Sequence, residues 1–214
     1  MAVRDSQRHY IAKCGRTARP PGVRDLDKTI ISAEDLLQDS FRLGLDVLES
    51  GFRPTLIIAI WRGGTPVGMA VQEILAYAGI DADHIAIRTS SYVGVDERSA
   101  VAVHGLNYII KKICFDDRVL IVDDVFDTGH TIAAVLRELA ARARGNTPED
   151  IRIAVPWYKP ARNETDIVPD YYLHETSEWL VFPHELDALT PEELRAARPA
   201  VADVVEQTRT AGEG

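Results

Sequence analysis

Two adjacent acids and a turn of small polar residues form the most chemically informative segment of the sequence, Val119–Thr131 (VLIVDDVFDTGHT). Asp123 and Asp124 directly follow a run of branched apolar residues. Carboxylates can accept hydrogen bonds from hydroxyls or help to hold hydrated Mg²⁺. The turn that starts at Asp127 leads into a helical sequence, so its backbone N–H groups and the helix N-terminus favour an anion such as phosphate. The segment therefore predicts a phosphate site whose acids need a divalent cation or a sugar diol beside them.

The elements that must position these residues are a buried strand before the acids and a helix after the turn. A short apolar run bounded by polar residues is typical of a strand in a parallel sheet. By the same criteria, strands are predicted at 55–60, 84–90, 119–122, 151–158, 171–174 and 180–182, and helices at 33–50, 66–77, 106–113, 132–144 and 190–198. Strands that alternate with helices indicate an α/β fold with a parallel sheet and right-handed crossovers.

Composition limits the classes of function. The chain has 214 residues, of which 46% are hydrophobic and 27% charged, as in a globular protein with a substantial core. A formal net charge of −9 disfavours general attraction to nucleic acid or to an anionic membrane. We expect neither a membrane helix nor a secretory signal, because no apolar run is long enough and the N-terminus lacks an apolar block. Cys14 and Cys114 are isolated, which favours a reducing cytoplasmic location.

We divide the chain into a peripheral N-terminal arm (1–30), one catalytic domain (31–189) and a C-terminal helix with its tail (190–214). Thr190, Pro191 and the two following glutamates form a capping-box start for that helix. Residues 91–105 show no sustained periodicity, and we expect a long mobile loop there. Loops of this length in compact domains tend to be functional.

The segment Val119–Thr131 resembles the phosphoribosyl-diphosphate signature of the type I phosphoribosyltransferases. In that family the paired acids hold the ribose hydroxyls and the small-residue turn wraps the 5′-phosphate. Response-regulator receivers also end a strand in Asp-Asp, but near the start of the domain, whereas roughly half of this chain precedes the pair. A Walker loop would need a lysine after Gly129. The resemblance implies a parallel sheet flanked by helices with a small hood, and Mg²⁺ as cofactor.

The resemblance also assigns the residues around the diphosphate. Asp123, Asp124, Thr128, Gly129, His130 and Thr131 are expected to bind the phosphoribosyl part, with Arg62 and Gly63 on the pyrophosphate. The family often carries a non-proline cis peptide there, which would fall at or beside Trp61–Arg62. Ser91 and Tyr92 would begin the flexible loop that closes over the reacting centre and excludes water.

On the base side, the resemblance suggests five positions. Asp127 would exchange a proton with the imidazole ring of a purine, although the residue alone could equally cap the next helix. Lys159 would donate to a 6-oxo group, for which adenine offers no acceptor. Trp179 would stack on the base and the backbone of Val181 would contact its edge, while Trp179 could also be a core residue. Glu185 would join Asp123 and Asp124 as a magnesium ligand, either directly or through water, and His184 would be peripheral.

Together these implications predict a purine salvage enzyme that transfers phosphoribosyl to hypoxanthine or guanine and releases pyrophosphate. The alternatives are an enzyme that prefers xanthine or adenine, and a nucleotide-sensing regulator of the same fold without catalysis. The expected partners are the small-molecule substrates and further copies of the chain, as a dimer or tetramer.

Overall fold

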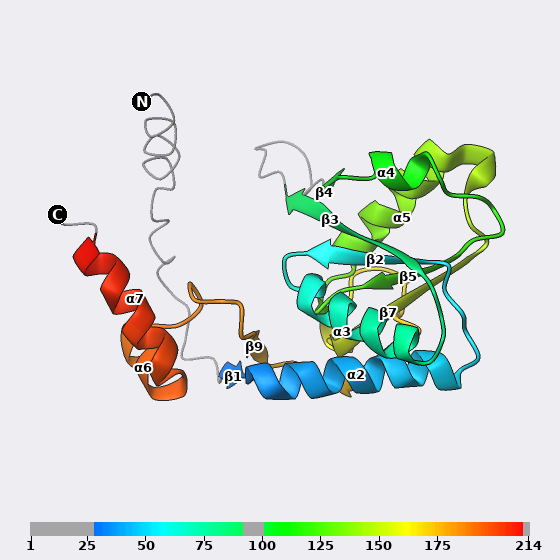
Figure 1. The fold of residues 1–214 in the computed structure, drawn as a ribbon. Helices are drawn as coiled ribbons and strands as arrows, with labels where there is room; N and C mark the ends of the chain where they lie inside the picture. The colour runs from blue at the N-terminus through cyan, green and yellow to red at the C-terminus, as the bar shows by residue number, and fades with distance from the viewer. Residues whose placement is uncertain (1–27, 92–100, 212–214) are drawn as a thin grey trace, which may run out of the picture.

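A computed structural model describes residues 28–91 and 101–211, and a mostly parallel sheet is its centre (Figure 1). The strand order is β4-β3-β2-β5-β7-β6, with β8 also paired to β7. The strands of this sheet are β2 (Leu56–Trp61), β3 (Asp83–Ser91), β4 (Val101–His104), β5 (Arg118–Val122), β6 (Val125–Phe126), β7 (Asp150–Tyr158) and β8 (Tyr171–Glu175). Only the β3–β4 pair is antiparallel, which confirms the parallel α/β prediction.

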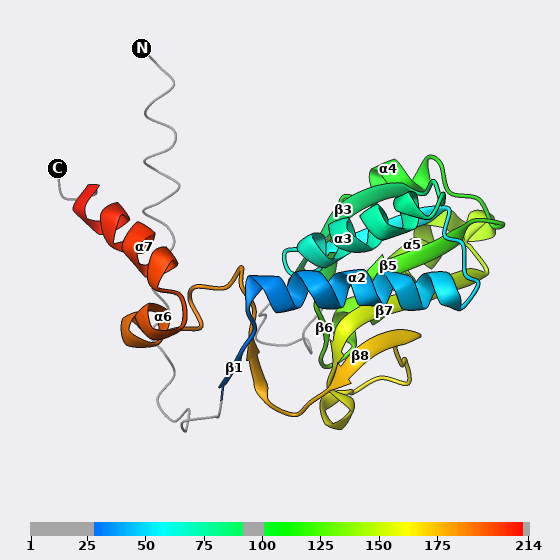
Figure 2. The same cartoon turned by 60° about the horizontal axis from the view of Figure 1, so that its bottom comes forward.

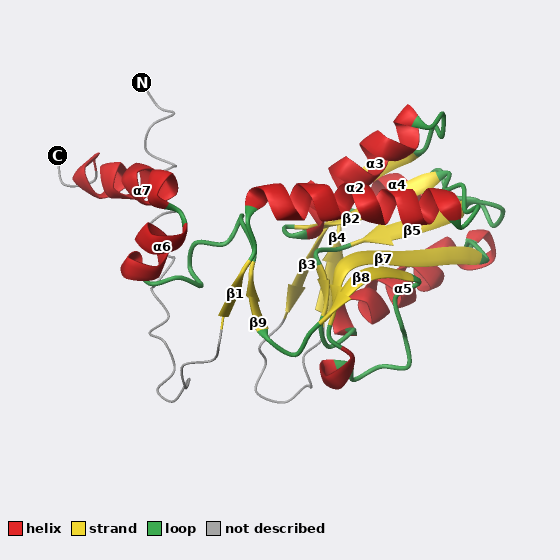
Figure 3. Cartoon of the chain, turned by 90° about the horizontal axis from the view of Figure 1, so that it is seen from below, coloured by secondary structure: helices red, strands yellow, loops and turns green. Residues whose placement is uncertain are grey.

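Helices cover both faces of this sheet (Figure 3). On one face lie α2 (Ala33–Glu49) and α3 (Gly64–Tyr77), whose Leu43 and Val71 pack against Ile57 and Leu120. On the other face lie α4 (Asn107–Ile110) and α5 (His130–Ala143), which belong to a second core cluster with Ile121. A strand with helices on both sides is buried on both faces, which explains the uninterrupted apolar run of β5.

Local signals account for several helix boundaries. Ser32 caps α2 as predicted, because its side chain accepts a hydrogen bond from the backbone N–H of Asp35. Gly51, with φ of 83°, follows the end of this helix. Thr190 and Glu193 form the predicted capping box of α6 (Pro191–Ala197). The following helix α7 (Pro199–Ala211) was not predicted, since a tail was expected after position 198. It begins at Pro199, and proline is well tolerated in the first turn of a helix.

A smaller layer lies beside the main sheet (Figure 2). In it, β1 (Lys28–Ile30) pairs in parallel with β9 (Trp179–Val181). Residues 28–30, the end of the predicted N-terminal arm, are therefore a strand of the fold, and they pair with the segment that is predicted to bind the base. Helices α6 and α7 follow β9 and lie apart from the α/β body in Figures 1 and 2. An ion pair of 2.8 Å between Lys28 Nζ of β1 and Glu193 of α6 joins the smaller layer to the C-terminal helices.

The prediction of a loop over 91–105 is wrong for Ser91 and for residues 101–104, which belong to strands. Ser91 ends β3, and β4 returns antiparallel to it, with Ser91 opposite Val101. Four residues are too few to show strand periodicity in a sequence, and pairing with an exposed sheet edge is what defines β4. The helix expected at 106–113 is also shorter, with α4 spanning only Asn107–Ile110. Tyr92 lies outside the described residues. In the part of the chain that the structure describes, no helix is long and apolar enough to cross a bilayer.

Candidate active site

The turn Asp127–Thr131, here called the phosphate turn, lies between β6 and α5. Gly129 has φ of 83°, a left-handed conformation that side chains other than glycine rarely adopt. It is the N-cap of α5, and no side chain caps the helix. The His130 N–H makes only a long contact of 3.5 Å with the Thr128 hydroxyl, so the start of α5 keeps backbone donors that suit an anion. This geometry also decides against the alternative role of Asp127 as a helix cap, because its carboxylate does not cap α5.

Asp123 and Asp124 follow β5 at the carboxyl edge of the sheet. The backbone N–H of Asp124 donates to Asp123 Oδ1 at 3.0 Å. Burial raises the pKa of Asp123 well above its usual value, and the neighbouring charge of Asp124 raises it further. A carboxylate that is costly to ionise gains from a cation or from hydroxyl donors. The pair thus suits either a ribose or a metal-bound diphosphate.

The loop after β2 approaches these acids from the neighbouring strand. Its Trp61–Arg62 peptide bond is cis, where the resemblance placed such a bond. Gly63 lies against the Asp124 carboxylate so closely that a Cβ on Gly63 would overlap it. A Cβ on Gly64 would lie 2.5 Å from the Val122 carbonyl oxygen. Both glycines are needed because the backbone of this loop packs directly on the end of β5.

Asp127 and Lys159 come together because β6 pairs in parallel with β7. Phe126 is opposite Tyr158, so the next residue of each strand extends from the same edge. Lys159 is only 6% exposed, and its Nζ lies 3.7 Å from Asp127 Oδ2. Arg162 Nε lies 2.8 Å from Asp127 Oδ1 without the alignment that a hydrogen bond requires. Asp127 is therefore placed between two cations, and its Oδ1 has no hydrogen-bond partner.

A hollow of about 480 Å³ brings together other predicted residues. Arg62 and Trp179 line it with His184, Glu185, Leu186, Asp187 and Ala188. Trp179 is 47% exposed, so it is not the core residue that its type also allowed. Val181 is fully buried, and its carbonyl already accepts hydrogen bonds from the Ile31 N–H at 3.0 Å and from Arg198 at 3.4 Å. Glu185 Oε2 accepts a hydrogen bond from the Phe182 backbone N–H at 3.0 Å.

Unsatisfied polar atoms gather at this site. Among the described residues, four buried side-chain atoms have no hydrogen-bond partner: Thr65 Oγ1, Asp127 Oδ1, Trp157 Nε1 and His184 Nδ1. All except the Trp157 atom belong to the segments just described. A buried polar atom without a partner costs about 1–3 kcal/mol. A polar ligand that reached these atoms would recover that free energy.

Asp123, Asp124 and Glu185 are the acids predicted to hold Mg²⁺. No group of three or more His, Cys, Asp or Glu is arranged to hold a metal in the described part of the chain. Magnesium at phosphate sites is usually held by one or two carboxylates, water and the substrate phosphates. The adjacent carboxylates of Asp123 and Asp124 fit this requirement. Glu185 fits it less well, because one of its oxygens is already bound to the Phe182 N–H.

Sequence reasoning missed several contacts. His184, expected to be peripheral, lies with Nε2 3.3 Å from Asp124 Oδ2. Arg162 was not considered, although it approaches Asp127. Glu164 contacts the phosphate turn twice, because its N–H donates to the Thr128 carbonyl and its carboxylate lies 2.7 Å from His130 Nε2. None of these residues belongs to a spacing pattern, so only the folded loops could reveal them. Ser91 is the last residue of β3.

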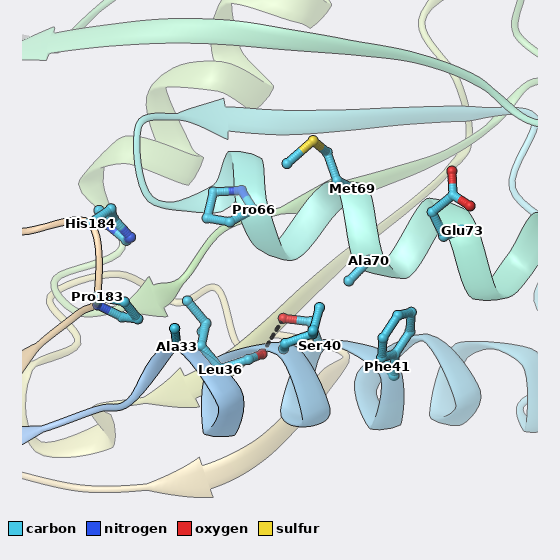
Figure 4. Close-up of a pocket in the computed structure, with 11 residues that line it drawn as sticks. Ala33, Leu36, Ser40, Phe41, Pro66, Met69, Ala70, Glu73, Pro183 and His184 are labelled. Carbon is cyan, nitrogen blue, oxygen red and sulfur yellow. Dashed lines mark hydrogen bonds between the residues drawn. The ribbon is translucent and has the colours of Figure 1, made fainter. Parts of the chain in front are cut away.

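An apolar groove between α2 and α3 is a separate feature (Figure 4). It encloses about 390 Å³, and Figure 4 shows Met69 and Phe41 beside it, with His184 at one end. The Ser40 hydroxyl, one of its few polar groups, is already bound to the Leu36 carbonyl at 2.6 Å. The groove therefore offers little chemistry, and the candidate active site is the polar edge of the sheet.

Comparison with known proteins agrees with this geometry. The phosphoribosyl transferase domain family matches residues 29–189, and the chain belongs to this family. The fold is that of the type I phosphoribosyltransferases. The matched residues include the phosphate turn, both acids, Lys159 and Trp179.

Individual relatives are purine phosphoribosyltransferases. A hypoxanthine/guanine phosphoribosyltransferase of Methanocella arvoryzae is 37% identical over 137 residues, which are 61% of this chain and 59% of the relative. The alignment with this curated relative thus spans less than two thirds of its length. The crystal structure of a purine phosphoribosyltransferase from Pyrococcus horikoshii has a TM-score of 0.60 at 30% identity and covers 77% of this chain and 98% of its own. A xanthine-guanine-hypoxanthine phosphoribosyltransferase of Helicobacter pylori shares the fold, with a TM-score of 0.57 at 22% identity over 79% of this chain and 99% of its own.

Proposed function

We propose that this protein transfers the phosphoribosyl group of 5-phosphoribosyl 1-diphosphate to hypoxanthine or guanine, forming the nucleoside monophosphate and pyrophosphate. The observation that carries this proposal is the placement of Asp127 and buried Lys159 next to a phosphate turn, with Nζ and Oδ2 3.7 Å apart. A proton acceptor and a cationic donor side by side match the ring nitrogen and the 6-oxo group of these bases. The similarity to a hypoxanthine/guanine enzyme supports the same substrates.

The phosphoribosyl part has its own set of residues. Thr128, Gly129, His130 and Thr131 bind the 5′-phosphate at the start of α5, and Asp123 and Asp124 hold the ribose hydroxyls. Arg62 and the backbone at Gly63 receive the pyrophosphate. These contacts are remote from the anomeric carbon, and they position it for attack by the base.

Asp123 and Asp124 would also hold Mg²⁺, and Glu185 would reach it on the pyrophosphate side, either directly or through water. The metal, when bound, neutralises charge that develops on the departing diphosphate. Arg62 adds a protein charge to the same leaving group. The ribose develops positive charge at the same time, and the nearby carboxylates stabilise it.

On the base side, Trp179 stacks on the purine and the Val181 backbone contacts its edge. Lys159 donates to the 6-oxo oxygen, which distinguishes the 6-oxopurines from adenine. Asp127 accepts the proton of the imidazole ring nitrogen as the glycosidic bond forms, which is general base catalysis. The protein acts in the cytoplasm, as a homo-oligomer.

One substrate panel tests the proposal. Purified protein is incubated with Mg²⁺, phosphoribosyl diphosphate and each of hypoxanthine, guanine, xanthine and adenine, and nucleotide formation is followed. We expect product with hypoxanthine or guanine and much less with adenine. Dominant use of adenine would overturn the assignment of Lys159. Dominant use of xanthine would replace hypoxanthine and guanine as the substrates but leave that assignment intact, because xanthine also carries a 6-oxo group. Tight binding of the diphosphate without product from any base would instead indicate a sensor of the same fold.

A further inference from the structure

The loop that carries the base-binding backbone and Glu185 is held from outside the matched family region by one arginine. Arg198 is the C-cap residue of α6, beyond position 189, where the family match ends. Its guanidinium donates to five backbone carbonyls: those of Ile31 (3.5 Å), Val181 (3.4 Å), Phe182 (3.1 Å), Pro183 (3.1 Å) and Glu185 (3.0 Å). Four of these carbonyls belong to residues 181–185, here called the base-side loop.

The base-side loop contains two of the proposed ligand contacts. In the proposed function, the backbone near Val181 contacts the base and Glu185 serves the pyrophosphate side. Within the loop, the Phe182 N–H binds Glu185 Oε2 at 3.0 Å and the Glu185 N–H binds the Phe182 carbonyl at 3.0 Å. The Phe182 carbonyl thus accepts from both the Glu185 N–H and Arg198, while three further carbonyls of the loop accept from Arg198. A planar guanidinium with donors in a fixed fork can hold several carbonyls in one arrangement, which an ammonium cannot.

The charge of Arg198 is used on carbonyl dipoles and not on an ion pair. No carboxylate makes an ion pair with it in the ranges 28–91 and 101–211. Burial accordingly lowers the pKa of Arg198, and the charge of Glu185 opposes this effect. A guanidinium that gives up solvation without a carboxylate partner is retained for the geometry that it enforces.

We propose that Arg198 is a positioning residue for the base, acting through the base-side loop, so that the C-terminal helices are part of the base pocket. This inference rests on the proposed function, since it assumes that a purine lies against Val181. Arg198 does not contact the reacting atoms. Its loss leaves the phosphate turn intact, because that turn is built by β6 and α5.

The experiment compares Arg198→Gln with Arg198→Lys, and uses Arg195→Gln as the matched control. Arg195 lies on the same helix, but it pairs with Asp203 and Glu206 of α7 and does not contact the base-side loop. Two ligands are titrated by calorimetry against each protein: ribose 5-phosphate, which reports the phosphate turn, and guanosine monophosphate, which also reports the base. Steady-state KM values for guanine and for the diphosphate are measured in parallel.

For Arg198→Gln we expect guanosine monophosphate binding to weaken about 10- to 100-fold, the range expected for losing hydrogen bonds to a charged donor. KM for guanine should rise in step, while ribose 5-phosphate affinity changes by less than about twofold. Arg198→Lys should be intermediate, because it keeps the charge and loses the fork. Arg195→Gln should behave as the wild type.

Other results would overturn the inference. Unchanged nucleotide binding in Arg198→Gln, or equal weakening of both ligands, would mean that Arg198 does not position the base. Equal loss in Arg195→Gln would assign the effect to helix docking. Should Arg198→Gln fail to fold, Arg198→Lys carries the comparison, and the same criteria apply to it. A wild-type protein that binds both ligands but makes no nucleotide would refute the proposed catalysis alone, because the binding arms still test Arg198.

Discussion

Gly63 lies against the carboxylate of Asp124, with no room between them for a methyl group. The two residues follow adjacent parallel strands, β2 and β5, whose ends meet at the edge of the sheet that carries the candidate active site. The loop proposed to bind pyrophosphate and the acid proposed to bind ribose are therefore packed as one unit. A change at either residue must displace the other.

Gly63→Ala tests this contact. The added Cβ forces Asp124 or the loop to move, and misplacement of about 1 Å can cost 10²-fold in rate. We expect kcat/KM for the diphosphate to fall by about 10²-fold, measured by steady-state kinetics at saturating guanine. Gly145→Ala is the control, because a Cβ there meets nothing within 4 Å. An active Gly63→Ala enzyme with wild-type KM would show that Asp124 can shift without consequence.

Gly129→Ala separates backbone conformation from local crowding in the phosphate turn. Gly129 and Gly51 share φ of +83°, but only at Gly129 would a Cβ meet the Thr165 hydroxyl and the Phe126 ring. A left-handed residue with a side chain costs about 1–2 kcal/mol. Gly51→Ala should lose about that much stability and keep its affinity for ribose 5-phosphate.

We expect Gly129→Ala to lose more stability than Gly51→Ala and also to lose measurable ribose 5-phosphate binding. Urea denaturation and calorimetry measure the two effects. If both alanine variants lost stability equally and both bound the ligand, crowding around Gly129 would have no role in the turn.

Lys159→Met tests base recognition. Methionine fills the buried space of the lysine stem but cannot donate a hydrogen bond. We expect kcat/KM for guanine and hypoxanthine to fall about 10- to 100-fold, because a hydrogen bond from a charged donor is lost. Binding of ribose 5-phosphate should be unchanged. The exposed Lys111→Met is the control, and an equal loss of activity with every base would contradict a role in selecting 6-oxopurines.

The sequence was sufficient to predict the parts of the site that follow directly from strand order. Asp123 and Lys159 could be placed because each follows a buried strand, and parallel strands end at the same edge. The contacts of His184, Arg162 and Arg198 could not be placed. Each depends on how a loop or terminal helix folds back over the sheet, and no periodic pattern encodes that path. The strand β4 was missed for the same reason, since its partner β3 defines it.

Asp123→Asn gives a prediction for pH. The pKa of Asp123 is raised in the folded protein by burial and by Asp124, above the usual 3.8. The folded state therefore binds this proton more tightly than the unfolded state, and its contribution to stability is lost as pH rises from about 4 through the raised pKa. A pKa raised by one pH unit corresponds to about 1.4 kcal/mol.

In the absence of Mg²⁺ and diphosphate, Asp123→Asn should thus gain stability relative to the wild type as pH rises from 4 to 8. Asparagine keeps the oxygen that accepts the Asp124 N–H and has no charge to desolvate. Urea unfolding of both proteins at several pH values measures the difference. A difference that stays constant with pH would mean that Asp123 titrates normally in the folded protein.

Asp127→Asn tests the proton transfer itself. The carboxylate does not cap α5, since Gly129 is the N-cap and the His130 N–H contacts the Thr128 hydroxyl, so its replacement should not unfold the helix. Asparagine keeps the shape and removes the base, and general acid/base groups contribute about 10²- to 10⁴-fold. We expect kcat to fall by at least about 10²-fold with retained ribose 5-phosphate affinity, measured by turnover and calorimetry. The control is Asp166→Asn, because Asp166 is an exposed acid in the loop between β7 and β8. Undiminished turnover in Asp127→Asn would remove this residue from the mechanism.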